Sequence, residues 1–140
     1  MSNQENLVQS LMLSRDDWEE HLKTNYAIKI TPDRENDHIV SLKYDQIDSP
    51  MRELIVRQCR GMVIDKKNKL VLARPYDKFW NWNDSLVDPI DWDSATVQEK
   101  VDGSLMILYH YEGNWHVASS GHPTAGGAYD NSGNLFRNLF

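Results

Sequence analysis

The sequence predicts an α+β fold in which antiparallel strands follow an N-terminal helical segment. Apolar residues recur at helical spacing near the N-terminus, within residues 3–24. Beyond them, short alternating or apolar stretches are separated by polar turns, a pattern typical of strands joined by hairpins. No repeat or low-complexity tract interrupts this order. Residues 1–140 are therefore expected to belong to one domain.

The helical segment is defined by four apolar positions with helix-compatible spacing: Leu7, Leu11, Trp18 and Leu22. Within it, Ser14 is followed by two aspartates, which resembles the start of a helix. After the segment, residues 26–30 and 38–44 alternate between apolar and polar side chains, and a polar turn separates them. We expect these two stretches to be strands.

The next region, residues 53–74, is dense in β-forming residues, with short apolar stretches at 54–56 and 61–64. A polar turn at 65–69 precedes a further strand at 70–73, which Arg74 and Pro75 end because proline cannot continue a central ladder. Residues 76–95 read as irregular and acidic. The remaining strands are expected at 96–101, 104–111 and 115–119, the last two joined by a tight turn.

The C-terminal residues read as a polar, glycine-rich loop at 124–133 followed by the beginning of an amphipathic helix. Ser132 or Asn134 would cap this helix, and the apolar residues between Leu135 and Phe140 would form one face. A domain seldom ends in the middle of such a face. The sequence therefore suggests a domain truncated at its C-terminal side, although a short terminal turn packed on the sheet is the simpler alternative.

Composition and charge exclude several classes of protein. The 140 residues are 40% hydrophobic and 26% charged, as in soluble globular proteins, and no apolar run approaches the roughly 20 residues of a membrane span. We find no signal peptide and expect a cytoplasmic protein. The single cysteine, Cys59, excludes an internal disulfide and a cysteine-based zinc cluster. The five histidines show no metal-ligand spacing, so no metal-ligating residues are predicted.

The formal net charge is −6, and residues 71–140 contain only four basic residues: Arg74, Lys78, Lys100 and Arg137. Such a chain does not hold nucleic acid by bulk positive charge. If it acts on nucleic acid, it must use a few well-placed cations.

The strongest chemical signal is the sequence Glu-Lys-Val-Asp-Gly-Ser-Leu at residues 99–105. Lys100 is expected at the end of a strand, and Gly103 would allow a ligand to approach the backbone closely. A lysine amine becomes a nucleophile when burial or nearby positive charge lowers its pKa. By itself, Lys-x-Asp-Gly is also a common surface turn, so the neighbouring motifs decide between the two interpretations.

Two further segments contain candidate cations. Arg60 lies in Cys-Arg-Gly just before an expected strand, and its guanidinium group suits phosphate oxygens, although a salt bridge to Asp65 or Glu53 is the alternative. Lys78 is followed directly by the aromatic residues Phe79 and Trp80. A cation beside an aromatic surface suits a nucleotide, although Lys78 could instead be a solvated loop lysine.

Four motifs occur in order over residues 53–120: Cys-Arg-Gly, Arg-Pro-x-x-Lys-Phe-x-Asn, Lys-x-Asp-Gly-Ser-Leu and a strand ending in Ser-x-Gly. Together they closely resemble the N-terminal half of the nucleotidyltransferase domain of ATP-dependent RNA ligases, as in phage strand-repair enzymes. The resemblance implies an ATP-grasp-like ligase fold within the superfamily that forms covalent lysyl-nucleotide intermediates.

The resemblance also implies a reaction. Lys100 would attack the α-phosphate of ATP, release pyrophosphate and form lysyl-AMP. The AMP would pass to an RNA 5′-phosphate, and an RNA 3′-hydroxyl would then displace it and seal the strand. Magnesium would neutralise the developing charge. ATP, Mg²⁺ and RNA ends are thus the expected ligands.

Further roles follow residue by residue from the same resemblance. Arg60 and Lys78 match positions that contact the nucleotide phosphates or the RNA end. Glu99 is similar to the residue that reads the adenine amine, although a charge at a strand edge is an equal alternative. The remaining matches are Asp102, which would orient the lysine or a metal-bound water, Gly103 beside the ribose, and Phe79 beside the nucleotide pocket.

Two departures from the family pattern are visible. The Ser-x-Gly strand often contains a lysine in related ligases, but Ser120 and its neighbours offer no cation here. The later motifs that grip the ribose and the α-phosphate would lie beyond Phe140, in a C-terminal domain or a second chain. Two alternatives therefore stay open: another lysyl-nucleotide enzyme, such as a DNA ligase or a capping guanylyltransferase, or a non-catalytic or split subunit that binds nucleotide or RNA ends.

Overall fold

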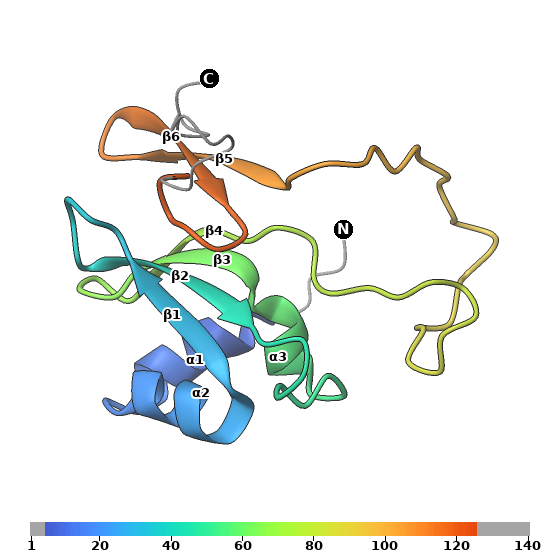
Figure 1. The fold of residues 1–140 in the computed structure, drawn as a ribbon, viewed down its shortest axis with the longest axis horizontal. Coiled ribbons are helices and arrows are strands. Elements are labelled where there is room, and N and C mark those ends of the chain that lie inside the picture. The colour runs from blue at the N-terminus through green and yellow to red at the C-terminus, as the bar shows by residue number, and fades with distance from the viewer. Residues whose placement is uncertain (1–4, 126–140) are drawn as a thin grey trace.

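The computed structural model describes residues 5–125, which form an α+β arrangement with two antiparallel sheets, as predicted (Figure 1). The order of elements is α1 (Leu7–Ser14), α2 (Trp18–Tyr26), β1 (Ile28–Pro32), β2 (Ile39–Tyr44), α3 (Leu54–Gln58), β3 (Arg60–Asp65), β4 (Leu70–Ala73), β5 (Met106–Tyr111) and β6 (Asn114–Ser119). The loop expected at 124–133 lies mostly outside the described residues, and the terminal helix lies entirely outside them.

The N-terminal helical segment consists of two helices, and the second begins where the sequence predicted a helix start. Asn6 caps α1 by accepting a hydrogen bond from the backbone N–H of Gln9 at 3.0 Å. Arg15 then adopts an extended conformation and ends α1, and α2 follows Asp17. Neither helix is long and apolar enough to cross a membrane, nor is any other helix among residues 5–125.

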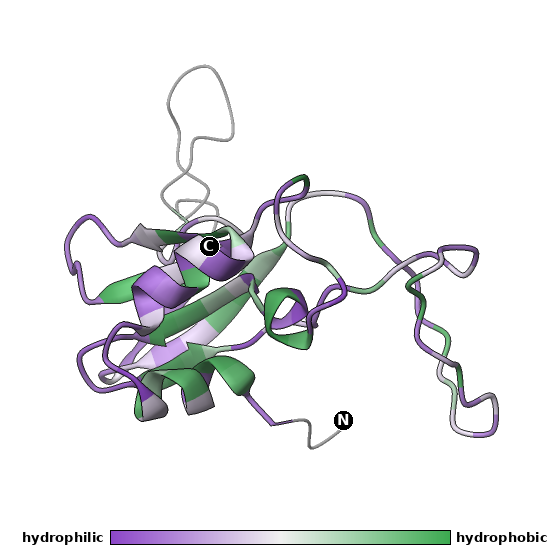
Figure 2. Ribbon diagram, turned by 90° about the horizontal axis from the view of Figure 1, so that it is seen from below, coloured by the Kyte–Doolittle hydropathy of each residue, from purple (hydrophilic) through white to green (hydrophobic). Residues whose placement is uncertain are grey.

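The four-stranded sheet has the order β1-β2-β3-β4, and all its neighbouring strands are antiparallel. One face packs against the helices. The core on this side includes the buried residues Val8, Met12, Trp18, Leu22, Ile28, Val40, Leu42, Ile55, Val56, Cys59, Met62 and Ile64. In Figure 2, hydrophobic residues, drawn in green, occur on both the strands and the helices that form this core. Each fully buried aliphatic side chain there stabilises the fold by about 1.5–3 kcal/mol.

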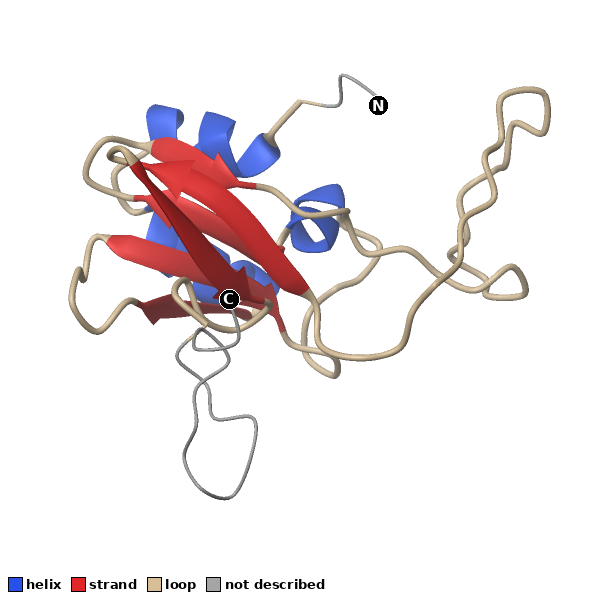
Figure 3. Cartoon of the chain, turned by 90° about the horizontal axis from the view of Figure 1, so that it is seen from above, coloured by secondary structure: helices blue, strands red, loops and turns tan. Residues whose placement is uncertain are grey.

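The opposite face of the sheet is covered by the β5–β6 hairpin, so the domain has three layers (Figures 1 and 3). A second core forms from Ile39, Val63, Ile107, Tyr109 and Ala118. Successive residues of a strand point to opposite faces, which is why Ile39 and Val40 belong to different cores. The strands at 61–64, 70–73 and 115–119, and the turn between β5 and β6, lie as predicted within a residue or so.

Two hydroxyl groups fasten the hairpin to the rest of the fold. Tyr111 donates a hydrogen bond to the Asp65 carboxylate at 2.7 Å, and Tyr109 donates one to the backbone carbonyl of Pro123 at 2.9 Å. Burial raises the pKa of Tyr109 to about 12, and the negative charge of Asp33 adds to the effect. Both tyrosines therefore stay protonated and keep donating well above neutral pH.

Residues 54–58 form helix α3, which corrects the expectation of an apolar extended stretch at 54–56. The physical reason is a tertiary contact. The fully buried side chain of Gln58 accepts a hydrogen bond from the backbone N–H of Leu7 at 2.9 Å and donates one to the carbonyl of Glu5 at 2.9 Å. The amide of Gln58 thus satisfies backbone groups at the start of α1, which holds α3 against that helix.

The strand predicted at 96–101 is wrong: residues 74–105 form one long irregular connection between β4 and β5 (Figure 3). All residues from 88 to 105 are exposed, and Val97 is 94% exposed. A strand requires a neighbouring backbone to pair with its N–H and C=O groups. No described segment pairs with residues 96–101, so no ladder forms there. For the same reason β5 begins at Met106 rather than at residue 104.

Candidate functional site

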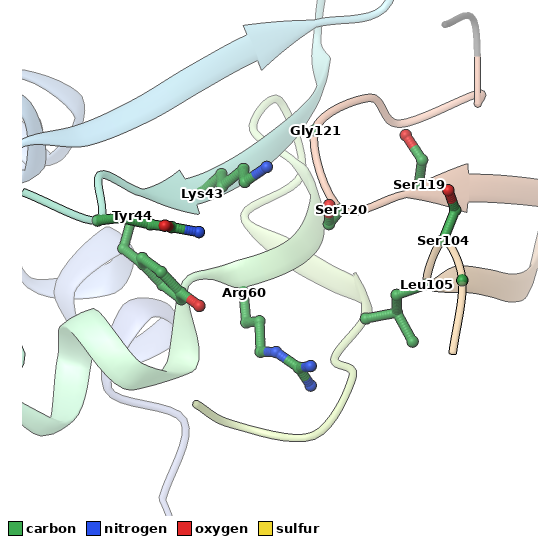
Figure 4. Close-up of a pocket in the computed structure, with 10 residues that line it drawn as sticks. Lys43, Tyr44, Arg60, Ser104, Leu105, Ser119, Ser120 and Gly121 are labelled. Atoms are coloured by element: carbon green, nitrogen blue, oxygen red, sulfur yellow. The ribbon is translucent and has the colours of Figure 1, made fainter. Parts of the chain in front are cut away.

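A cleft of about 480 Å³ opens between the ends of β2 and β3 and the ends of the β5–β6 hairpin (Figure 4). It is lined by Lys43, Tyr44, Gln46, Arg60, Gly103, Ser104, Leu105, Ser119, Ser120 and Gly121. Two cations and three serine hydroxyls face this space together with glycine backbone. Such groups suit an anionic, oxygen-rich ligand.

Arg60 enters this cleft because of a β-bulge. In the β2–β3 ladder, Leu42 pairs with Met62 and Lys43 pairs with Arg60, which leaves Gly61 as an extra residue with a φ of +96°. A bulge re-aims the side chains beside it. Without the bulge, Arg60 would pair one position further along β2 and would point to the opposite face.

The Arg60 guanidinium is held by neutral groups rather than by an acid. It donates a hydrogen bond to the Tyr76 carbonyl at 3.4 Å and lies 5.1 Å from the centre of the Phe79 ring. The alternative of a salt bridge to Asp65 or Glu53 is wrong. Asp65 is occupied by Tyr111 and Asn68, and no carboxylate among residues 5–125 forms an ion pair with Arg60.

Lys78 and Phe79 lie in a second, wider cleft of about 780 Å³ beside the first. The Lys78 amine donates to the Phe79 carbonyl at 3.1 Å and lies 5.3 Å from the centre of the Trp80 ring. Arg57 covers the same indole at 4.5 Å and pairs with Asp88 at 3.0 Å. Through these contacts the structure brings Arg60, Lys78 and Phe79 into one neighbourhood.

Glu99, Lys100 and Asp102 lie in the exposed connection and are not among the residues that line either cleft. The Lys100 side chain is 75% exposed, and its amine lies 3.6 Å from a carboxylate oxygen of Asp102, whose side chain is fully exposed. The expectation that Lys100 lies at the end of a strand is wrong, because residues 96–105 form no ladder. The last three residues of the motif, Gly103, Ser104 and Leu105, do line the first cleft.

Comparisons with known proteins identify the family. The sequence model of a family described as RNA ligase matches residues 58–137, more than half of the chain. The chain belongs to this RNA ligase family. It is also 29% identical, over 112 residues, to a protein of Autographa californica nuclear polyhedrosis virus described as "Putative bifunctional polynucleotide kinase/RNA ligase". That alignment covers 72% of this chain and 16% of the viral protein, and no solved structure matches the chain.

The region that matches the RNA ligase family begins just before Arg60 and includes every residue that the sequence singled out for the site. The match to the RNA ligase family was predictable from the sequence because this region contains the four motifs in order. The helices α1 and α2 and the strands β1 and β2 lie outside this region. They support the site from the N-terminal side, and β2 contributes Lys43 and Tyr44 directly to the cleft.

The described residues fit magnesium only as an ion that a nucleotide carries. No group of three or more histidine, cysteine, aspartate or glutamate side chains among residues 5–125 is arranged to hold a metal by itself. Magnesium in nucleotide sites is commonly held by one or two carboxylates together with substrate phosphates. Asp102 has an exposed carboxylate beside Lys100, but it lines neither cleft.

Lys43 is the functional candidate that the sequence motifs did not reveal. Lys43 lies in no motif, but the alternation of residues 38–44 indicates which face of the sheet its side chain occupies. Leu42 is buried against the helices, so Lys43 must point to the opposite face, where the cleft lies.

Proposed function

We propose that this RNA ligase family member is the N-terminal part of an adenylylating nucleotidyltransferase domain. In the proposed reaction, the Lys100 amine attacks the α-phosphorus of ATP, and the protons that the amine loses pass to solvent. A nitrogen–phosphorus bond forms, the bond to the bridging oxygen breaks, and pyrophosphate leaves with the electron pair. The AMP then passes to an RNA 5′-phosphate, and an RNA 3′-hydroxyl displaces AMP and closes the strand.

One observation carries this proposal. Gly103, Ser104 and Leu105, the last three residues of the nucleophile motif, line the same cleft as Arg60. Lys100 is therefore tethered three residues from a cation-lined pocket, and Asp102 is the only described acid that forms an ion pair with its exposed amine. A nucleophile on a short, open segment beside an anion site is suited to attack on a bound phosphate.

The other residues are assigned supporting roles within this proposal. Arg60 and Lys78 would bind phosphates of the nucleotide or the RNA end, and Phe79 would lie beside the nucleotide. Glu99 would accept a hydrogen bond from the adenine amine, and Asp102 would orient the Lys100 amine. Magnesium that arrives with ATP would neutralise charge on the phosphates.

A second candidate function is nucleotide or RNA-end binding without chemistry by this chain alone. It is favoured by the separation of the exposed residues 99–102 from the cluster of Arg60, Lys78 and Phe79. The chain spans only 16% of the length of the viral relative, so the catalysis of a complete ligase includes contributions that other segments would make.

The test is incubation of the chain with α-labelled ATP and Mg²⁺, followed by denaturing mass analysis. We expect one AMP adduct, stable to alkali and labile to acid as a phosphoramidate is, located on Lys100. Lys100→Ala and Lys100→Arg should both abolish it. An adduct that survives Lys100→Ala would refute the assignment of the nucleophile.

Arg60→Ala separates chemistry from binding in the same assay. Loss of a charged phosphate contact should reduce the yield of adduct about tenfold or more at limiting ATP. Lys67→Ala is the control, because it also removes one positive charge but lies in the β3–β4 turn and lines neither cleft. Bound ATP with no adduct in the wild type would favour the second candidate function.

A further inference from the structure

Three cations form a row across the sheet at the mouth of the cleft. Lys29 of β1 pairs in register with Lys43 of β2, and Lys43 pairs in register with Arg60 of β3. Directly opposed residues of neighbouring antiparallel strands point to the same face, and neighbouring strands lie about 4.8 Å apart. The row therefore extends about 10 Å across the strands.

The face that carries the row is the one toward the hairpin and the cleft. Ile28, Ile30 and Leu42 belong to the core on the helix side, so Lys29 and Lys43 must point the other way. The bulge at Gly61 adds Arg60 to the same face. In Figure 4 the Lys43 amine extends from the end of β2 toward the turn at Ser120 and Gly121.

The row is costly for folding alone. Like charges placed directly opposite each other destabilise a sheet, and no carboxylate among residues 5–125 forms an ion pair with Lys29, Lys43 or Arg60. The lining of the cleft contains no acidic residue, although the chain has 21 acidic residues against 15 basic ones. A concentration of unopposed positive charge on such an acidic chain points to an anionic ligand.

The position of Lys29 indicates how far the anionic ligand must extend beyond the cleft. Lys43 and Arg60 line the cleft, but Lys29 is exposed and lies one strand outside it. A mononucleotide in the cleft meets two of the cations, whereas a polynucleotide presents a phosphate at every residue and can meet all three. We infer that Lys29 and Lys43 form, with Arg60, a phosphate track that binds the RNA strand next to the end held in the cleft. This inference rests on the proposed function, because it takes RNA as the ligand.

The test compares two ligands on the same variants. Binding of a single-stranded 5′-phosphorylated RNA twelve-mer and of ATP is measured for the wild type, Lys29→Gln and Lys43→Gln at several salt concentrations. We expect each substitution to weaken RNA binding roughly threefold to tenfold at 0.1 M salt, and to make the slope of log K against log salt shallower by about 0.7. The affinity for ATP should stay unchanged in Lys29→Gln.

Lys67→Gln is the matched control. It removes the same charge from the β3–β4 turn, at the opposite end of β3 from Arg60, and should leave the affinity for RNA within twofold of the wild type. The inference is overturned if RNA binding is absent in the wild type, if Lys29→Gln behaves like Lys67→Gln, or if Lys43→Gln weakens ATP and RNA equally while Lys29→Gln affects neither. Failure of the proposed function has a different signature, since the AMP adduct on Lys100 is measured without RNA.

Discussion

Gly61 and Ser120 are in such close contact that no side chain fits between them. A β-carbon on residue 61 would lie 2.8 Å from the Cα of Ser120 and 3.2 Å from its carbonyl oxygen. The absence of a side chain at residue 61 lets the backbone at the end of the hairpin approach β3 closely. This contact joins β3 to the segment after β6, and both border the cleft that contains Arg60.

We expect Gly61→Ala to lower the free energy of unfolding by about 2–4 kcal/mol. The loss combines a backbone φ of +96°, which L-residues rarely adopt, with overlap against backbone atoms that cannot rotate away. Urea unfolding followed by circular dichroism measures it. Gly113→Ala is the control, because Gly113 has a φ of +81° and nothing within 4 Å of an added β-carbon. It should lose only about 1 kcal/mol, and equal losses in both variants would contradict the close contact.

The hydrogen bond from Tyr111 to Asp65 should make stability depend on pH. Burial by itself would raise the pKa of Asp65, but hydrogen bonds from Asn68 and Tyr111 outweigh it and lower that pKa. A lowered pKa means stability that is present above the ordinary value near 4 and is lost as the pH falls through the native value. Tyr111→Phe should cost about 1.5–3 kcal/mol at pH 7 and clearly less at pH 3.

Tyr109→Phe is the matched control for this measurement, since the Tyr109 hydroxyl donates to a neutral carbonyl at Pro123. Its loss, about 1 kcal/mol, should be the same at pH 7 and pH 3. Urea unfolding curves at the two pH values decide the point. A deficit for Tyr111→Phe that does not shrink in acid would show that the charge of Asp65 contributes nothing to the bond.

Cys59 should be unreactive until the domain unfolds. Its side chain is completely buried in the core on the helix side, and burial, with a smaller contribution from the charge of Asp77, raises the pKa of the thiol. Only the thiolate reacts with disulfide reagents, so labelling in native buffer should be undetectable over minutes and should rise in parallel with unfolding in urea. A second thiol at an exposed site, Ser85→Cys, should react at once. Fast labelling of the native wild type would contradict the burial.

The sequence predicted those elements whose pattern reports local burial. The β5–β6 hairpin alternates because one of its faces packs on a core. Residues 39–44 also alternate, although both faces of β2 meet a core, and the pattern identified both elements. Residues 54–58 were misjudged because their helix depends on Gln58, which bonds to backbone more than 50 positions away in the chain. Residues 96–101 were predicted to be a strand, but no described strand pairs with them. A local sequence pattern predicts whether a segment suits a sheet and does not supply its neighbour.

The motifs named some residues that the structure brings together and others that it leaves apart, since Glu99, Lys100 and Asp102 line neither cleft. Arg60, Lys78 and Phe79 were identified from their neighbours in the sequence, and the structure brings them together. Lys43 comes from a strand with no motif and reaches Arg60 only because one residue of β3 bulges out of the ladder. A β-bulge of one residue has no distinctive pattern in a single sequence. The pairing of Lys43 with Arg60 could therefore not be predicted.

The exposed connection yields a last prediction, on protease sensitivity. All residues from 88 to 105 are exposed and none belongs to a ladder, so trypsin can bind this backbone without local unfolding. The bond after Lys100 should be cleaved first, well before the bonds after Lys43 and Arg60, which lie in the sheet. Limited proteolysis with mass analysis of the earliest fragments measures the order, and Lys100→Gln should remove this first cut. Early cleavage after Lys43, with Lys100 protected, would show that the motif is packed and the sheet edge is open.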